Sequence, residues 1–216
     1  KATGLLLLCT GRATKQIEQL MLDRKEYVAT LKFGATTPSF DLEHPEDAHY
    51  PYEHITQGML EEALQEFLGT TLQVPPIFSA VSVGGKRAYD LARKGKDCQL
   101  EGKPITIHEL EVVSFEPPYA TLRVSCGKGT YIRSLARDLG ERLQSGAYLT
   151  ALRRTQLGNV RVEDSLTLAE LPDFLTHAEL NEEGFDLTPL EFEMLKRDYA
   201  ELNEEGFDPV VPPTSK

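Results

Sequence analysis

Residues 122–143, LRVSCGKGTYIRSLARDLGERL, constrain the fold more than any other stretch of this chain. Apolar and polar residues alternate over 122–126, which is the period of a strand with one buried face. Gly127 and Gly129 then allow a tight turn, including a positive φ. Thr130 has the side chain of a helix N-cap. The apolar residues that follow have helical spacing: Ile132, Leu135, Ala136, Leu139 and Leu143. The stretch therefore predicts a strand, a glycine turn and a helix.

Arg133 is unusual in the first turn of that predicted helix. A cation at this end opposes the helix macrodipole, at a cost of about 0.3–1 kcal/mol. We therefore expect an anion beside the guanidinium group, either a carboxylate or a phosphate. The alternative interpretation is an exposed arginine on an amphipathic helix.

The remaining pattern predicts an α+β fold with a mixed, largely antiparallel sheet flanked by helices. Strand patterns occur at 5–9, 25–33, 78–83, 105–115, 120–126, 148–155 and 160–162. Helical patterns occur at 13–22, 56–68, 88–94, 131–143 and 167–171. Within the second strand pattern, Tyr27, Ala29, Leu31 and Phe33 share one face. Strands dominate, and the order of the elements shows no βαβ alternation.

The negative charge of the chain is concentrated at its C-terminal end. The net charge is −11, of which residues 170–216, with 13 acidic and 3 basic residues, contribute −10. The rest of the chain is nearly neutral, and its cations occur in clusters that suit phosphate contacts. The nonapeptide AELNEEGFD occurs twice, at 178–186 and 200–208. We expect one domain over 1–172 and an acidic segment over 173–216.

No pattern indicates a metal site, a disulfide framework or a nucleotide cofactor. The three cysteines are far apart, and no CxxC pair occurs. His44, His49 and His54 have a five-residue spacing that fits neither one helix face nor a short ligand pair. The GKG at 127–129 lacks the P-loop pattern, and no GxSxG elbow occurs. Because no transmembrane-length apolar run or secretory signal is present, we expect a cytoplasmic protein.

Several motifs occur in an order that is more specific than any one of them. They are ATGLLLLCTGRATK at 2–15, KEYVATLKFGATT at 25–37, PPIFSAV at 75–81, GKRAYDLARKG at 85–95, KGTYIRSLARDLG at 128–140 and LRRT at 152–155. With these motifs, residues 2 to about 172 resemble the TruB-type family of tRNA pseudouridine synthases. The resemblance implies the pseudouridine synthase fold. It also implies isomerisation of uridine to pseudouridine at position 55, in the T-loop of tRNA.

The resemblance implies a partner and a mode of binding as well. The partner is the T-arm of tRNA, and the target base must be flipped out of its stack before it can react. The family uses neither a metal nor an organic cofactor. No membrane contact is expected, and since nothing in the sequence calls for an assembly, we expect a monomer.

The resemblance assigns roles to four residues of a uridine pocket. Tyr27 would stack on the flipped base, which is worth about 1–3 kcal/mol per base. Tyr131 would line the same pocket and orient the catalytic carboxylate, while Leu152 would close its apolar wall and exclude water. Arg133 would pair with the catalytic aspartate and keep it ionised. Phosphate contacts are expected from a set of cations: Lys15, Lys128, Arg153 and Arg154.

The catalytic aspartate of the family is expected outside the printed residues. The family pattern is GTLDPxATG, and the sequence matches it only at Ala2, Thr3 and Gly4. The aspartate would therefore lie three residues before Ala2, and Asp41 is assigned a loop role. The family's C-terminal PUA domain is not recognisable in the acidic segment.

The chain alone is consequently expected to be inactive. The alternative function is a catalytically inactive RNA-binding or RNA-remodelling module that keeps the uridine pocket. A protein-interaction domain that acts through the acidic segment is a third interpretation.

Overall fold

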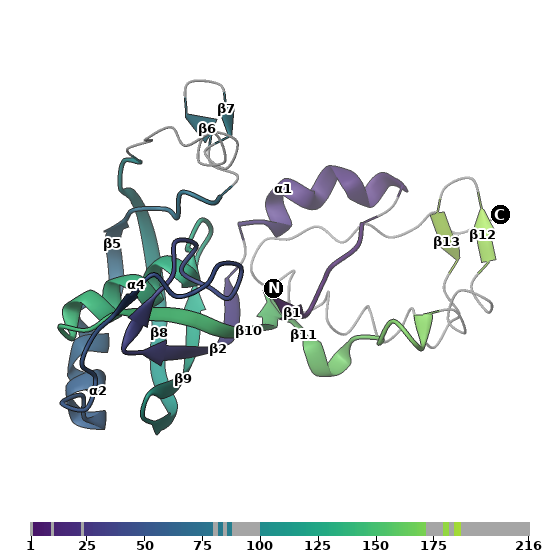
Figure 1. Cartoon of the computed structure of the whole chain (residues 1–216). Helices are drawn as coiled ribbons and strands as arrows, with labels where there is room; N and C mark the ends of the chain where they lie inside the picture. Colours follow the sequence, from purple (N-terminus) through teal and green to yellow (C-terminus); the bar gives the residue numbers. More distant parts are fainter. Residues whose placement is uncertain are drawn as a thin grey trace. The chain divides into compact units, whose positions relative to one another are not determined.

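One sheet organises the structure, a computed structural model that describes residues 2–9, 11–22, 24–79, 82–83, 86–87, 100–171, 179–181 and 184–186. Its strands are β1 Thr3–Gly4, β2 Lys25–Phe33, β5 Gly69–Gln73, β8 Lys103–Glu116, β9 Tyr119–Cys126, β10 Ala147–Leu157 and β11 Val160–Arg161. Their spatial order is β1-β10-β2-β9-β8-β5, and β11 pairs with β10 (Figure 1). The pairs β2–β9, β9–β8, β8–β5 and β10–β11 are antiparallel. The predicted α+β fold with a largely antiparallel sheet is confirmed.

The chain divides into two compact units. The first comprises residues 1–3 and 24–154, and the second comprises residues 4–23 and 155–216. The second unit contains the 3₁₀ helices η1 Gly11–Gln16 and η2 Val162–Asp164, the helix α1 Ile17–Leu20 and the hairpin of β12 Glu179–Asn181 and β13 Gly184–Asp186. The hairpin strands belong to the first copy of AELNEEGFD, whereas the second copy lies outside the described residues. In the described part of the chain, no helix is long and apolar enough to cross a membrane.

The core of the first unit lies between the sheet and two helices, α2 Gln57–Gln65 and α4 Ile132–Arg142 (Figure 1). Alternate residues of β2 and β9 supply the sheet side: Ala29, Leu31, Phe33, Ala120, Leu122 and Val124. The helices add Leu60, Ala63, Leu64, Leu135, Ala136 and Leu139. The predicted shared face of β2 is confirmed for its last three members, which are fully buried, while Tyr27 packs against this core half-buried.

Two local devices place these helices. At the start of α2, the Thr56 hydroxyl accepts a hydrogen bond from the Met59 N–H, so the predicted cap is confirmed. Within α4, a β-carbon added at Gly140 would collide with the backbone nitrogen of Ala147. Glycine is therefore needed at this position for the helix to approach the first residue of β10.

The strand expected over 5–9 is wrong. The ladder of β1 ends at Gly4, whose φ of +94° takes the chain out of the sheet direction. Leu6 and Leu8 are each 71% exposed, so the apolar run is not a buried strand.

Three other expectations also need correction. Among the described residues of 78–83, only Ser82–Val83 forms a strand, β6, which pairs with β7 Lys86–Arg87. The helix expected over 13–22 consists of η1 followed by α1. The N-cap position of α4 belongs to Tyr131, because the Thr130 hydroxyl donates to the Gly127 carbonyl instead. The helix expected over 88–94 lies outside the described residues.

Candidate active site

The turn between β9 and α4 sets the position of the site. The Gly127 N–H donates to the Thr106 carbonyl at 2.9 Å, and the Thr130 hydroxyl donates to the Gly127 carbonyl at 3.2 Å. Gly129 has a φ of +84°, a conformation that favours glycine, as the sequence predicted for this turn. The turn therefore delivers Arg133 into the first turn of α4.

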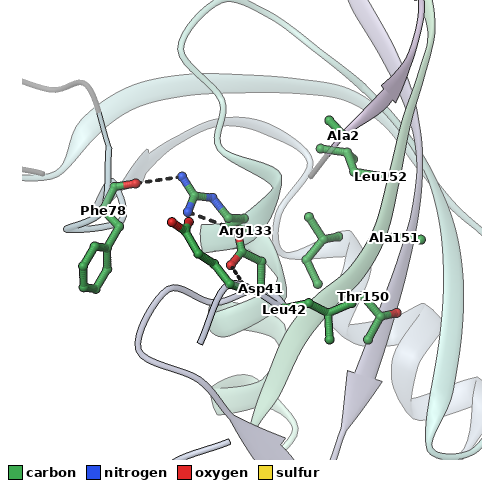
Figure 2. Close-up of a pocket in the computed structure, with 10 residues that line it drawn as sticks. Ala2, Asp41, Leu42, Phe78, Arg133, Thr150, Ala151 and Leu152 are labelled. Atoms are coloured by element: carbon green, nitrogen blue, oxygen red, sulfur yellow. Dashed lines mark hydrogen bonds and ion pairs between the residues drawn. The ribbon is translucent and has the colours of Figure 1, made fainter. Parts of the chain in front are cut away.

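Arg133 binds three groups, each at least 55 residues away in the sequence. Figure 2 shows its contacts with Asp41 and Phe78. Its Nη1 lies 3.3 Å from Oδ2 of Asp41 and donates to the Ser39 carbonyl at 3.2 Å. Its Nη2 donates to the Phe78 carbonyl at 2.9 Å. The anion expected beside Arg133 is thus present, and it is a carboxylate. Residue 78, which the sequence placed in a strand, lies in a bend, and its carbonyl accepts from this guanidinium group.

Asp41 is held in place by its own loop. Its Oδ1 accepts hydrogen bonds from the Ser39 hydroxyl at 2.7 Å and from the Glu43 N–H at 3.0 Å. The Thr37 hydroxyl donates to the Asp41 carbonyl at 2.7 Å. Both carboxylate oxygens are therefore used, and the side chain of Asp41 is only 12% exposed. The carboxylate is fixed before any ligand arrives.

The ion pair lies on the wall of a cavity of about 760 Å³, within the usual range for ligand pockets. The other lining residues come from β10, from the 41–43 loop, from the segment after β5 and from the N-terminal end of the chain (Figure 2): Ala2, Leu42, Glu43, Phe78, Leu149, Thr150, Ala151 and Leu152. The Thr3 hydroxyl donates to the Leu152 carbonyl at 3.3 Å, which fixes the N-terminal residues beside β10. Three charged residues, Asp41, Glu43 and Arg133, lie in an otherwise mostly apolar wall. This is the arrangement of a site that binds and orients a small polar group.

Of the four pocket residues predicted from the sequence, Arg133 and Leu152 lie on this cavity. Tyr27 and Tyr131 are half-buried and are not among its lining residues. Burial raises the pKa of the Tyr27 hydroxyl above its ordinary value, the Cys126 thiol adds to the rise, and the guanidinium group of Arg154 opposes it. The stacking role of Tyr27 stays a prediction.

The cations expected to contact phosphates have different surroundings. Lys128 at the tip of the glycine turn and Arg153 on β10 are exposed. Arg154 is half-buried beside Tyr27. Lys15 is exposed on η1, in the second unit. Their contacts with RNA stay predictions.

The three histidines of the 44–54 region do not come together. His44 packs against the Phe78 ring at a centroid distance of 4.7 Å, and His49 lies 3.6 Å from a carboxylate oxygen of Glu46. The His54 ring is hydrogen-bonded to the Leu143 carbonyl at 2.8 Å. Among the described residues, no group of three or more histidine, cysteine or acidic side chains could hold a metal ion.

Sequence reasoning missed Asp41 as the partner of Arg133, because the two residues are 92 positions apart. The spacing of Ser39 and Asp41 was the available signal, since a hydroxyl two residues before a carboxylate suits a tight hydrogen-bonded turn.

Comparison with known proteins identifies the family to which this chain belongs. Residues 1–132 match the family model for the TruB family pseudouridylate synthase N-terminal domain. The chain belongs to the TruB family. Residues 133–197 match a second model of the family, the tRNA pseudouridylate synthase B C-terminal domain, so the two TruB models meet inside α4. The family resemblance inferred from the motifs is confirmed.

Individual proteins of the TruB family support the same assignment. The chain is 56% identical over 181 residues to tRNA pseudouridine synthase B of Phocaeicola vulgatus, covering 84% of this chain and 77% of the relative. It is 47% identical over 167 residues to the protein of the same name from Flavobacterium johnsoniae, covering 77% and 73%. A chain in the crystal structure of a Cbf5–Nop10–Gar1 complex is similar, with a TM-score of 0.53 and 27% identity. This match covers 74% of the present chain and 39% of the solved one. The predicted pseudouridine synthase fold is confirmed.

Proposed function

We propose that this chain carries the uridine pocket of an enzyme that isomerises uridine to pseudouridine at position 55, in the T-loop of tRNA. The N1–C1′ bond of the nucleotide breaks and a C5–C1′ bond forms. The proton on C5 leaves, and N1 gains one. Nothing is oxidised or reduced overall, so the reaction needs side chains that hold the base, bind the sugar carbon and move one proton.

The Arg133–Asp41 pair on the cavity wall is the observation that carries this proposal. A guanidinium group has five N–H donors, and the contacts of Arg133 with described residues use three of them. Nε and one N–H of Nη2 remain for a second anion. Asp41 and two carbonyls therefore fix the guanidinium group, which then presents its other edge to a catalytic carboxylate.

That carboxylate is the family's aspartate, three positions before Ala2. Ala2 lines the cavity, and an extended chain spans at most about 3.6 Å per residue. The aspartate position thus lies within about 11 Å of Ala2, close enough to reach the cavity. Arg133 beside it favours its ionised form, the form that attacks the sugar.

The remaining residues hold the RNA. Leu152 excludes water from the pocket, and Tyr27 stacks on the flipped uracil ring. Tyr131 orients the aspartate. The exposed Lys15, Lys128 and Arg153, together with the half-buried Arg154, contact phosphates of the T-arm.

The test measures tritium release from tRNA labelled at C5 of uridine. It compares the printed chain with the aspartate-bearing form, in which the family's GTLDP segment precedes the chain, and with the aspartate-to-asparagine variant of that form. We expect turnover only in the aspartate-bearing form, and only when uridine rather than cytidine occupies position 55. All three proteins should bind tRNA.

Binding of tRNA without turnover in every form would favour the inactive RNA-binding module. Turnover by the printed chain would show that a nucleophile lies within it, contrary to the proposal. Deletion of 173–216 provides a further control. If the acidic segment is only a tail, tRNA binding survives the deletion or improves, because net negative charge is removed.

A further inference from the structure

The first turn of α4 is not capped by its own sequence. The first N–H groups of a helix have no partner within the helix and need one elsewhere. Tyr131, the N-cap residue, has an extended backbone with φ −102° and ψ 110° and gives no side-chain cap hydrogen bond. The hydroxyl of Thr130 is used inside the preceding turn. The local side chains therefore do not fix the start of α4.

Gln73, the last residue of β5, binds the N-cap residue from outside the helix. Its Oε1 accepts a hydrogen bond from the Tyr131 N–H at 2.8 Å, and its Nε2 donates to the Tyr131 carbonyl at 3.2 Å. The residue is only 5% exposed. One side-chain amide thus binds both polar backbone groups of a single residue 58 positions away. Two bonds in opposite directions fix the orientation of this residue as well as its position.

The next residue strengthens the connection between β5 and α4. The Val74 carbonyl accepts hydrogen bonds from the Ser134 hydroxyl at 2.8 Å and from Nη2 of Arg137 at 3.2 Å. Gln73 itself is paired with Lys103 of β8, so the amide is carried by the edge of the sheet. The first turn of α4 is therefore attached to a rigid support.

We infer that Gln73 is a positioning residue for the isomerisation: it clamps Tyr131 so that the first turn of α4 holds Arg133 against Asp41 at the cavity. Arg133 lies two residues after the clamped residue, and its contact with the Phe78 carbonyl ties it to the segment that follows β5. A catalytic group that is misplaced by about 1 Å can lose about a hundredfold in rate. The inference rests on the proposed function, since it assigns the clamp to that reaction.

The test uses Gln73→Met and Gln73→Glu in the aspartate-bearing form. Methionine has a similar length and neither hydrogen bond. Glutamate keeps the acceptor for the Tyr131 N–H but loses the donor to the Tyr131 carbonyl. Thr56→Ala is the control, because it removes the cap of another helix and reports the effect of lower stability alone. Single-turnover tritium release and the Kd for tRNA are measured below the unfolding temperature of every variant.

We expect Gln73→Met to lower the single-turnover rate constant at least about tenfold, with the Kd for tRNA changed less than about twofold. Gln73→Glu should recover part of this loss, and Thr56→Ala should keep the parental rate. A parental rate in Gln73→Met would overturn the inference, as would an equal loss in Thr56→Ala. If Gln73→Met does not fold, Gln73→Glu alone must show the lower rate at unchanged Kd.

An inactive parent would contradict the proposed function rather than the clamp. The clamp is then judged by hydrogen exchange. Gln73→Met should accelerate exchange of the amides of residues 131–134, and Thr56→Ala should not. Equal protection of these amides in the parent and in Gln73→Met would overturn the inference.

Discussion

The interaction between Asp41 and Arg133 can be measured directly by a double-mutant cycle in the stability of the chain. Asp41→Asn removes the charge of the carboxylate but keeps its shape. In asparagine, one carboxylate oxygen is replaced by an NH₂ group, which donates hydrogen bonds and does not accept them. The remaining oxygen can accept from Ser39 and Glu43 or from Arg133, but not from all three. Arg133→Met removes the guanidinium group and keeps much of the apolar stem.

The size of the interaction follows from its geometry. A hydrogen bond to a charged group contributes about 1.5–3 kcal/mol, and such bonds are usually about 2.7–2.9 Å long. The Nη1–Oδ2 distance is 3.3 Å, with the side chains 21% and 12% exposed, so we expect a coupling energy near the lower end, about 1.5 kcal/mol. Arg133→Met should cost more than Asp41→Asn, because it also leaves the Ser39 and Phe78 carbonyls without their donor.

Urea unfolding followed by far-UV circular dichroism is the assay, because the chain has no tryptophan. If the same variants are unfolded by heat instead, a coupling energy of about 1.5 kcal/mol corresponds to a change in Tm of about 3–6 °C for a domain of this size. The control cycle combines Asp41→Asn with Thr56→Ala, which share no contact in the described structure and should be additive. Additivity of Asp41→Asn and Arg133→Met within about 0.5 kcal/mol would refute the claim that the two side chains stabilise each other.

Three further predictions follow from particular contacts. Thr56→Ala should lower the free energy of unfolding by about 0.5–2 kcal/mol in the same assay, because the Met59 N–H loses its acceptor; no change would mean that water replaces the cap. Arg153→Ala should reduce the salt dependence of tRNA binding, so that the slope of log K against log salt becomes shallower by about one unit. Arg154 lies beside Tyr27, so Arg154→Ala should change this slope less. An equal change in the two variants would place both cations on phosphates. Because the pKa of Tyr27 is raised in the folded chain, the contribution of its neutral form to stability is complete below the ordinary tyrosine pKa and is lost as pH rises through the folded pKa. As pH rises into the alkaline range, Tyr27→Phe should therefore lose less stability than the parent. Parallel plots of stability against pH for the two proteins would contradict the raised pKa of Tyr27.

Periodicity predicted the elements whose packing is simple. β2 was found with its bounds, because one face of this strand is buried by the helices and the other is not. The pattern failed for 5–9, where four consecutive leucines do not indicate which side is covered. It also missed β5, whose sequence GTTLQ exposes its largest apolar residue, Leu72. An edge strand with polar faces has no clear alternation for sequence reasoning to use.

The site was only half predictable for a similar reason. The macrodipole argument correctly required an anion beside Arg133, because that argument depends on the local sequence alone. The identity of the anion could not follow from the sequence, since Asp41 is 92 residues away and depends on the closure of the whole sheet. Gln73 was missed altogether. A buried side-chain amide that binds another segment's backbone leaves no periodic signature.

The sequence separations within the site have a kinetic consequence. Arg133 bonds to groups 94, 92 and 55 residues away, so none of its partners is local. Contacts of this kind form late, because the entropy of closing the intervening loops must first be offset by other contacts. During refolding, α2 and α4 should gain helical circular dichroism before the cavity becomes able to bind its ligand. Ligand binding would then report completion of the topology, whereas helix content reports only its beginning.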